Sequence, residues 1–286
     1  MRLSPRHTQL MAWIASWLSA AVAVGALLTI IIYVFVQGAS VIDWDFLSTD
    51  PIGGIHAEGG IRSSIVGTMW IMVLTIAIAG PVGIGAGIYL AEYAADNWFT
   101  GIVRWVIETL TGVPSIVYGL FGYALFVAAL ALRFSILAGA LTLACLVLPT
   151  MIRTVEEAIR SVPKGHREGS LALGATKWQT IRHAVLPAAM PGIVTAIILA
   201  MGRAVEETAC LYVTMGGSAA RMPTSPLDPA RTLSLDVFYR ATQSLTPEKA
   251  FGAALILIVL ILIINAITRW VAGRWMARAQ GRLYGG

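Results

Sequence analysis

Six long stretches without any Asp, Glu, Lys or Arg limit what this chain can fold into more than any other feature of its sequence. They are Met11–Val36, Ser63–Ala91, Thr109–Leu132, Phe134–Ile152, Ala184–Gly202 and Ala250–Thr268. An apolar helix needs about 20 residues to cross a bilayer, so each stretch predicts one membrane-spanning helix. Only 12% of the residues are charged, whereas soluble domains average about 25%. We therefore expect an all-α polytopic membrane protein and neither a water-soluble globule nor a β-barrel, whose strands are about 10 residues long.

The positions of the basic residues predict which ends of the spans face the cytoplasm. If the N-terminus is cytoplasmic, thirteen Lys and Arg residues fall in inside segments and six in outside segments. Inside loops of membrane proteins are enriched in Lys and Arg, so both termini are expected to be cytoplasmic. The net charge of +5 is then mostly a topology signal, and no nucleic-acid partner is expected.

The spans divide the chain into three parts. Residues 1–62 hold the N-terminal segment, the first span and an outside loop; residues 63–272 hold a core of five spans with a cytoplasmic loop at 157–187; residues 273–286 form a basic cytoplasmic tail. In the core, Gly83 and Gly87 are four residues apart, which predicts close packing against another helix. The large outside loop is expected at residues 216–248, with a short amphipathic element at 233–239.

The inside loop before the fifth span is the longest and the most highly charged. It predicts a helix at His166–Leu173, a left-handed turn at Gly174 and a second helix from Thr176. Two short protruding helices would suit a groove on a cytoplasmic partner, although the loop could also be solvated and packed against the chain's own helices. Its apolar anchors would be Leu171, Leu173 and Trp178, with Glu168 and Lys177 at the polar rim.

One charged pair is expected at membrane depth, where ionisable side chains are costly and usually functional. Pro187 and Pro191 are expected to delay the fifth span to about residues 191–215, which places Arg203 near mid-membrane. Glu207 lies four residues on, one helical turn away, and can pair with Arg203. A second set, Arg153 and Glu156, lies near the inner end of the fourth span. Either set could line a substrate path or form structural ion pairs that fix helix register.

The inside loop resembles the EAA loop of ABC importer permeases. Glu168, Gly174, Leu186 and Pro187 match the pattern Glu-Ala-Ala-x3-Gly-x9-Ile-x-Leu-Pro, whereas Gly169, Ser170 and Ala184 depart from it. Further segments are similar to the phosphate-specific permeases, and the glycines near residue 60 favour the PstA type. These segments are residues 87–94, residues 112–122, and Glu207-Thr208-Ala209 after Arg203. The resemblance covers roughly residues 59–270.

This resemblance implies a type I ABC importer permease with the MetI-like fold in the bacterial inner membrane. Its implied partners are a second permease of the PstC type, a PstB-like ATPase dimer, a PstS-like extracytoplasmic phosphate-binding protein, and inorganic phosphate. It implies phosphate-path roles for Arg203, Glu207, Arg153 and Glu156, and ATPase coupling by Glu168, Leu171, Gly174, Trp178, Leu186 and Pro187. An importer of another oxyanion or small nutrient, such as molybdate or sulfate, is the alternative.

The chain itself is not expected to be an enzyme. Its only lysines are Lys164, Lys177 and Lys249, and none stands in the Gly-Lys-Ser/Thr context of a phosphate-binding Walker A loop. ATP and magnesium are therefore expected on a partner subunit, with no cofactor on this chain. The four histidines are scattered without a second ligand at metal-binding spacing, so no metal site is expected either.

Overall fold

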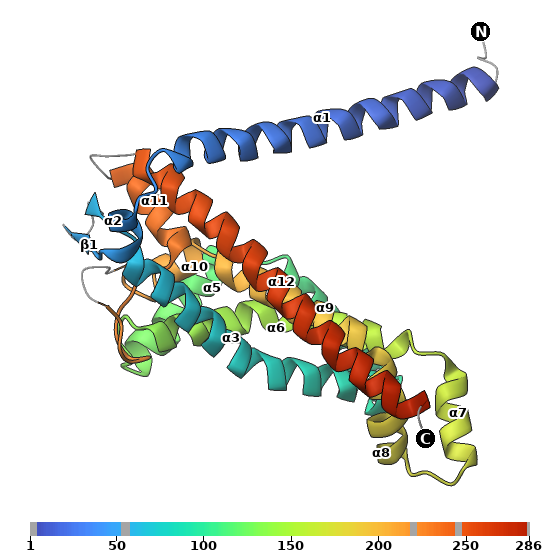
Figure 1. The fold of residues 1–286 in the computed structure, drawn as a ribbon. Coiled ribbons are helices and arrows are strands. Elements are labelled where there is room, and N and C mark those ends of the chain that lie inside the picture. The colour runs from blue at the N-terminus through green and yellow to red at the C-terminus, as the bar shows by residue number, and fades with distance from the viewer. Residues whose placement is uncertain (1–4, 53–57, 218–221, 244–247, 285–286) are drawn as a thin grey trace.

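The computed structural model describes residues 5–52, 58–217, 222–243 and 248–284 of the chain. Five of its helices are long and apolar enough to cross a membrane, and a bent pair makes a sixth if the pair is one span. The helices run in an elongated bundle (Figure 1). The expected all-α architecture is confirmed, and the third of the six expected spans corresponds to the bent pair. Parts of the expected outside loops, at residues 53–57, 218–221 and 244–247, lie outside the described residues.

The spans are joined by short elements at the two ends of the bundle (Figure 1). The long helices are α1 (Pro5–Ala39), α3 (Arg62–Ile88), α6 (Ile136–Arg160), α9 (Leu186–Glu206) and α12 (Glu248–Tyr284), and the bent pair is α4 (Trp98–Thr111) with α5 (Ser115–Gly122). At one end lie α7 (Lys164–Ala172) and α8 (Lys177–Thr180); towards the other lie α2 (Trp44–Ser48), the antiparallel strands β1 (Pro51–Ile52) and β2 (Glu58–Gly59), and α11 (Leu233–Gln243). The four-residue α10 (Ala209–Tyr212) and three π-helical turns, Tyr89–Tyr93, Tyr123–Ala129 and Ile181–Val185, complete the helical elements described.

Helices α3, α6 and α9 form the centre of the bundle, and glycines let α3 approach α6 closely. A Cβ atom at Gly83 would lie 3.0 Å from the side chain of Met151, and one at Gly87 would lie 2.6 Å from Cγ1 of Val155. Met151 and Val155 belong to the main buried core. The close helix packing expected at Gly83 and Gly87 is therefore confirmed, and α6 is the helix that they contact.

We expect Gly87→Leu to destabilise the chain and Gly85→Leu to leave its stability nearly unchanged. A Leu side chain at Gly87 would collide with Val155, whereas nothing lies within 4 Å of a Cβ at Gly85. Overpacking a well-packed core costs about 1–3 kcal/mol. Thermal unfolding of the two purified variants in the same detergent measures the difference. Equal melting temperatures would contradict the close contact between α3 and α6.

The bend before the third span shows that α4 is a separate helix. The α4 axis is turned by 101° from the segment Ser115–Ala129. α4 is therefore not a straight extension of the third span. Figure 1 also shows that α1 diverges from the bundle. Near its C-terminal end α1 packs against α12, where the rings of Tyr33 and Phe251 lie 5.5 Å apart.

The fifth span differs from its expected position at both ends. It is continuous from Lys177, through a π-helical turn, to Glu206, so α8 is the beginning of this span and no separate second short helix protrudes. Pro187 directly follows the π-helical turn Ile181–Val185, at the second residue of α9. The helix ends at Glu206 because Glu207 is extended and its carbonyl oxygen accepts a hydrogen bond from Ser234 of α11. Arg203 therefore lies in the last turn of α9, not in the middle of a helix that extends to residue 215.

Candidate functional site: a charged cavity between the spans

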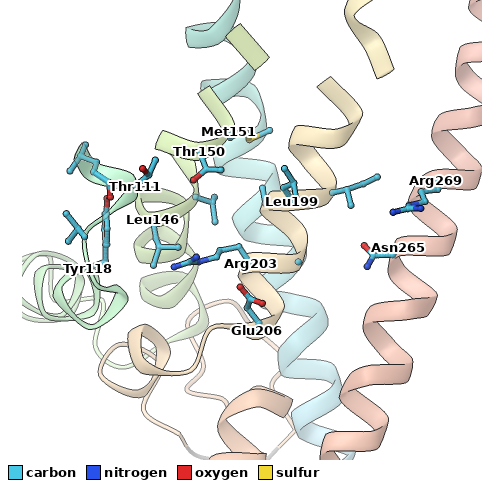
Figure 2. A pocket seen from close by; sticks show the side chains of 16 residues that line it. Thr111, Tyr118, Leu146, Thr150, Met151, Leu199, Arg203, Glu206, Asn265 and Arg269 are labelled. Atoms are coloured by element: carbon cyan, nitrogen blue, oxygen red, sulfur yellow. The ribbon is translucent and has the colours of Figure 1, made fainter. Parts of the chain in front are cut away.

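A cavity of about 480 Å³ lies between four of the membrane-spanning segments. Figure 2 shows the side chains around it. The bend between α4 and α5 contributes Leu110, Thr111, Val113 and Tyr118; α6 contributes Leu146, Val147, Thr150 and Met151; α9 contributes Ile198, Leu199, Ala200, Gly202, Arg203 and Glu206; α12 contributes Asn265 and Arg269. The wall is mainly apolar, with hydroxyl groups and three charged side chains. Such a cavity can hold a small polar or charged solute between apolar helices.

Arg203 extends from α9 towards Leu146 and Tyr118 on the opposite wall (Figure 2). Its Nε donates a hydrogen bond to Oε1 of Glu207 at 3.1 Å, so the expected pair is confirmed. The Arg203 side chain is 49% exposed, whereas that of Glu207 is only 8% exposed. Among the described residues, Nη1 and Nη2 of Arg203 have no hydrogen-bond partner in the protein. A buried carboxylate thus holds a guanidinium whose two outer nitrogens are left for another ligand.

The cavity also contains charged residues that sequence reasoning missed. Glu206, next to Glu207 in the sequence, lines the same cavity as Arg203. Asn265 and Arg269 lie four residues apart on α12 and line it as well. Their helical spacing places them on one face, and this signal was present in the sequence. The charged side chains of the wall are thus two arginines and one glutamate.

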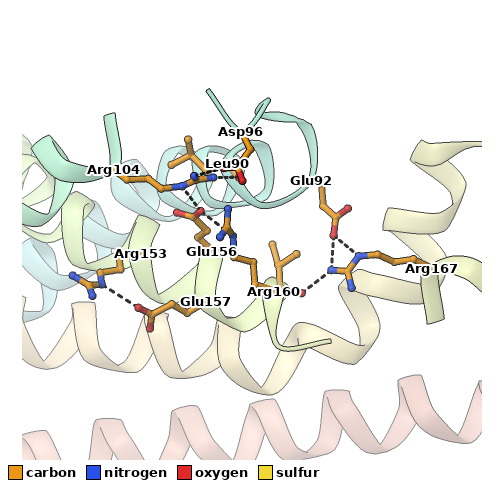
Figure 3. A network of polar contacts seen from close by, with 10 residues as sticks. Leu90, Glu92, Asp96, Arg104, Arg153, Glu156, Glu157, Arg160 and Arg167 are labelled. Atoms are coloured by element: carbon orange, nitrogen blue, oxygen red, sulfur yellow. Dashed lines mark hydrogen bonds and ion pairs between the residues drawn. The ribbon is translucent and has the colours of Figure 1, made fainter. Parts of the chain in front are cut away.

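Arg153 and Glu156 are not paired with each other (Figure 3). Arg153 contacts Glu108 at 2.8 Å and Glu157 at 3.0 Å. Glu156 is buried and contacts Arg104 at 2.8 Å and Arg160 at 3.1 Å. These residues surround a smaller pocket of about 210 Å³, whose charged lining consists of three arginines and three glutamates. All six of these charged side chains are already paired with one another.

The loop between α6 and α9 has the conformation that its glycine predicts. The expected helix at His166–Leu173 is present as α7, and Gly174 has φ +82°. Thr176 and Gln179 cap the start of α8 reciprocally. The three expected anchors are exposed, Leu173 by 90%, and Glu168 is exposed too, so these four side chains are not packed against the bundle. Leu186 and Pro187 are half-buried at the start of α9.

A buried group of charges fixes α11 at the opposite end of the bundle. Asp236 contacts Arg231 at 3.3 Å and Arg240 at 2.6 Å, and all three side chains have no exposed surface. Arg240 also donates hydrogen bonds to the carbonyl oxygens of Gly59 and Gly60. Burial lowers the pKa of Arg231, and the Asp236 carboxylate opposes this shift. The amphipathic element expected at residues 233–239 is confirmed as α11, but much of it is buried against the bundle.

The family model "Binding-protein-dependent transport system inner membrane component" matches residues 83–276. The probable ABC transporter permease protein YqgI of Bacillus subtilis is 37% identical over 269 residues, covering 89% of this chain and 91% of that protein. The phosphate transport system permease protein PstA 2 of Mycobacterium tuberculosis is 34% identical over 272 residues, covering 94% of this chain and 88% of that protein.

Solved structures of ABC transporters share the fold. A chain of a bacterial alginate ABC transporter, in complex with an alginate pentasaccharide-bound periplasmic protein, has a TM-score of 0.68 and 14% identity, covering 95% of this chain and 96% of that chain. A chain of the MetNI methionine ABC transporter, in an inward-facing conformation, has a TM-score of 0.55 and 20% identity, covering 77% of this chain and 94% of that chain. At these identities the likeness concerns the fold alone.

Proposed function

Because the chain belongs to the family of binding-protein-dependent transport system inner membrane components, we propose that it forms part of the path by which an ATP-driven importer carries inorganic phosphate across the bacterial inner membrane. Membership makes the chain an ABC importer permease subunit. Relatives named as phosphate transport permeases, which match most of the chain, support phosphate as the substrate. The observation that carries the proposal is Arg203, held by buried Glu207 with two guanidinium nitrogens left for a ligand.

Arg203 suits an oxyanion because a guanidinium presents several N–H donors in a planar fork that matches phosphate oxygens. In a cavity between apolar helices, its attraction to an anion is stronger than in water. Glu207 keeps the charge compensated when no anion is bound. We assign Arg203 and Glu207 to the phosphate path, with Glu206 and Arg269 on the same cavity wall. Arg153 and Glu156 belong to a more peripheral part of the path, where each is already paired.

The proposed complex contains four kinds of partner. A second permease subunit, similar to PstC, would complete the path, and a phosphate-binding protein similar to PstS would deliver the substrate. A PstB-like ATPase dimer would bind ATP and magnesium and contact the exposed loop around α7. In this arrangement both termini and α7 are cytoplasmic. The residues assigned to ATPase coupling are Glu168, Leu171, Gly174, Trp178, Leu186 and Pro187.

The proposal is tested by transport with the complete complex. The chain is co-expressed with its partner subunits, purified in mild detergent and reconstituted into vesicles containing ATP and magnesium. We expect uptake of radioactive phosphate that requires both the binding protein and ATP and that persists in excess sulfate or molybdate. Uptake of sulfate or molybdate without uptake of phosphate would show that the chain serves another oxyanion.

A further inference from the structure

One guanidinium joins α7 to the inner ends of two membrane-spanning helices (Figure 3). Nε and Nη2 of Arg167 donate hydrogen bonds to Oε1 of Glu92 at 2.9 and 2.6 Å. Arg167 also donates to the carbonyl oxygens of Val162 at 2.7 Å and Ile159 at 2.8 Å, beside the C-terminal end of α6. Glu92 lies in the π-helical turn that continues α3. Arg167 therefore binds α3 and α6 at once from within α7.

This contact is largely shielded from water. The Glu92 side chain is 9% exposed and that of Arg167 is 23% exposed. A shielded, charge-assisted contact holds its geometry better than an exposed ion pair, which solvent and salt weaken. A second contact joins the same turn to the other side of the loop, because Nζ of Lys177 lies 4.9 Å from the centre of the Tyr93 ring. Both α7 and the beginning of the fifth span at α8 are thus attached to the end of α3.

The helices that Arg167 connects are themselves firmly packed together. Gly87, five residues before Glu92, lies directly against Val155 of α6, and Gly83 lies against Met151. Met151 also lines the cavity that contains Arg203. A displacement of α7 would consequently move the adjoining ends of α3 and α6 and, through them, a wall of the cavity.

We propose that Arg167 and Glu92 are positioning residues that transmit movement of α7 to α3 and α6, and so couple ATP hydrolysis to opening of the substrate cavity. The inference rests on the proposed function, since it takes α7 as the contact for the ATPase. Without the Arg167–Glu92 pair, α7 would still bind the ATPase through its exposed side, but its movement would no longer displace the bundle. ATP would then be hydrolysed with little transport.

The test uses Glu92→Gln in the complete complex, with Asp96→Asn as the matched control. Asp96→Asn removes the same negative charge four residues further along the chain, at a side chain that is 95% exposed. We expect Glu92→Gln to lower the phosphate imported per ATP hydrolysed by about tenfold, within the range of measured couplings between sites. Asp96→Asn should leave this ratio unchanged. Hydrogen exchange of the amides in α7, measured in the same complexes, should become faster only in Glu92→Gln.

Three further variants separate coupling from folding. Arg167→Gln should uncouple like Glu92→Gln, and the double variant should be no worse than either single variant, because both remove one interaction. Arg167→Lys keeps the charge but cannot reproduce all four hydrogen bonds, so an intermediate ratio is expected even if the glutamine variants assemble poorly.

The outcomes distinguish this inference from the proposed function. An unchanged ratio and unchanged α7 exchange in Glu92→Gln, at wild-type complex yield, would overturn the inference. If the unaltered complex imports no phosphate, the proposed function fails. The inference is then decided by α7 exchange and by the ATPase activity that the binding protein stimulates in the complex. Both should change in Glu92→Gln and not in Asp96→Asn.

Discussion

Arg203→Gln is expected to abolish phosphate uptake per assembled complex, although loss of the ion pair with Glu207 lowers the yield of that complex. The substitution removes the positive charge that faces the cavity. A hydrogen bond to a charged group contributes about 1.5–3 kcal/mol, so loss of one such contact alone predicts a decrease of at least about tenfold, and loss of a two-pronged contact predicts more. Phosphate uptake into vesicles, normalised to the amount of complex, provides the measurement.

A double variant separates loss of a substrate contact from loss of an ion pair. Arg203→Gln leaves the buried Glu207 carboxylate without its cation, which is itself destabilising. In the double variant Arg203→Gln with Glu207→Gln, the two amides can form a hydrogen bond with each other. No unpaired carboxylate is then buried, but the positive charge is still absent. We expect uptake to remain absent in the double variant and to be reduced less in Glu207→Gln alone. Normal uptake by the double variant would show that the pair is structural.

Asp236→Asn is expected to prevent accumulation of the folded chain. Asp236 lies between Arg231 and Arg240, and none of the three side chains is exposed. Removal of one partner from a buried ionic group costs about 3–5 kcal/mol, a large part of the roughly 5–15 kcal/mol that stabilises a typical folded protein. The measurement is the amount of chain in membranes and its melting temperature in detergent.

Asp45→Asn is the control for this effect. Asp45 lies in α2, at the same end of the bundle, and is exposed, so its change should alter the melting temperature little. Wild-type membrane levels and an unchanged melting temperature for Asp236→Asn would mean that the two arginines find other compensation when the carboxylate charge is lost.

Local patterns were sufficient to predict the spans and the contacts that depend on neighbours in the sequence. The apolar runs gave the helices, Gly87 gave a close helix contact, Gly174 gave a left-handed turn, and the spacing of Arg203 and Glu207 gave their ion pair. Each of these features depends on residues within one or two helical turns, or on the absence of a side chain at a single glycine. At this short separation in sequence, the geometry of the helix itself determines which side chains are neighbours.

Contacts between distant segments could not be predicted in the same way. The end of α9 depends on Ser234, which bonds to the Glu207 carbonyl from 27 residues away. Arg240 falls within the outside loop expected at residues 216–248, yet it is buried and donates hydrogen bonds to carbonyl oxygens about 180 residues earlier. Glu156 pairs with Arg104, which lies 52 residues earlier. Arg153 and Glu156, near the inner end of the fourth span, therefore each bind other residues and not one another. Charge and spacing alone do not identify such partners.

The placement of α1 has a consequence for the order in which the protein is made. Among the described elements the ribosome synthesises α1 first, whereas α12, against which α1 packs near Tyr33 and Gly38, follows all the others. Ala39 and Glu248 are 209 positions apart, which corresponds to roughly 10–40 seconds of translation at typical bacterial and eukaryotic speeds. During that time α1 must remain inserted without its partner. Its mean hydropathy of 2.5 and its internally hydrogen-bonded backbone make α1 stable in the bilayer before α12 is inserted.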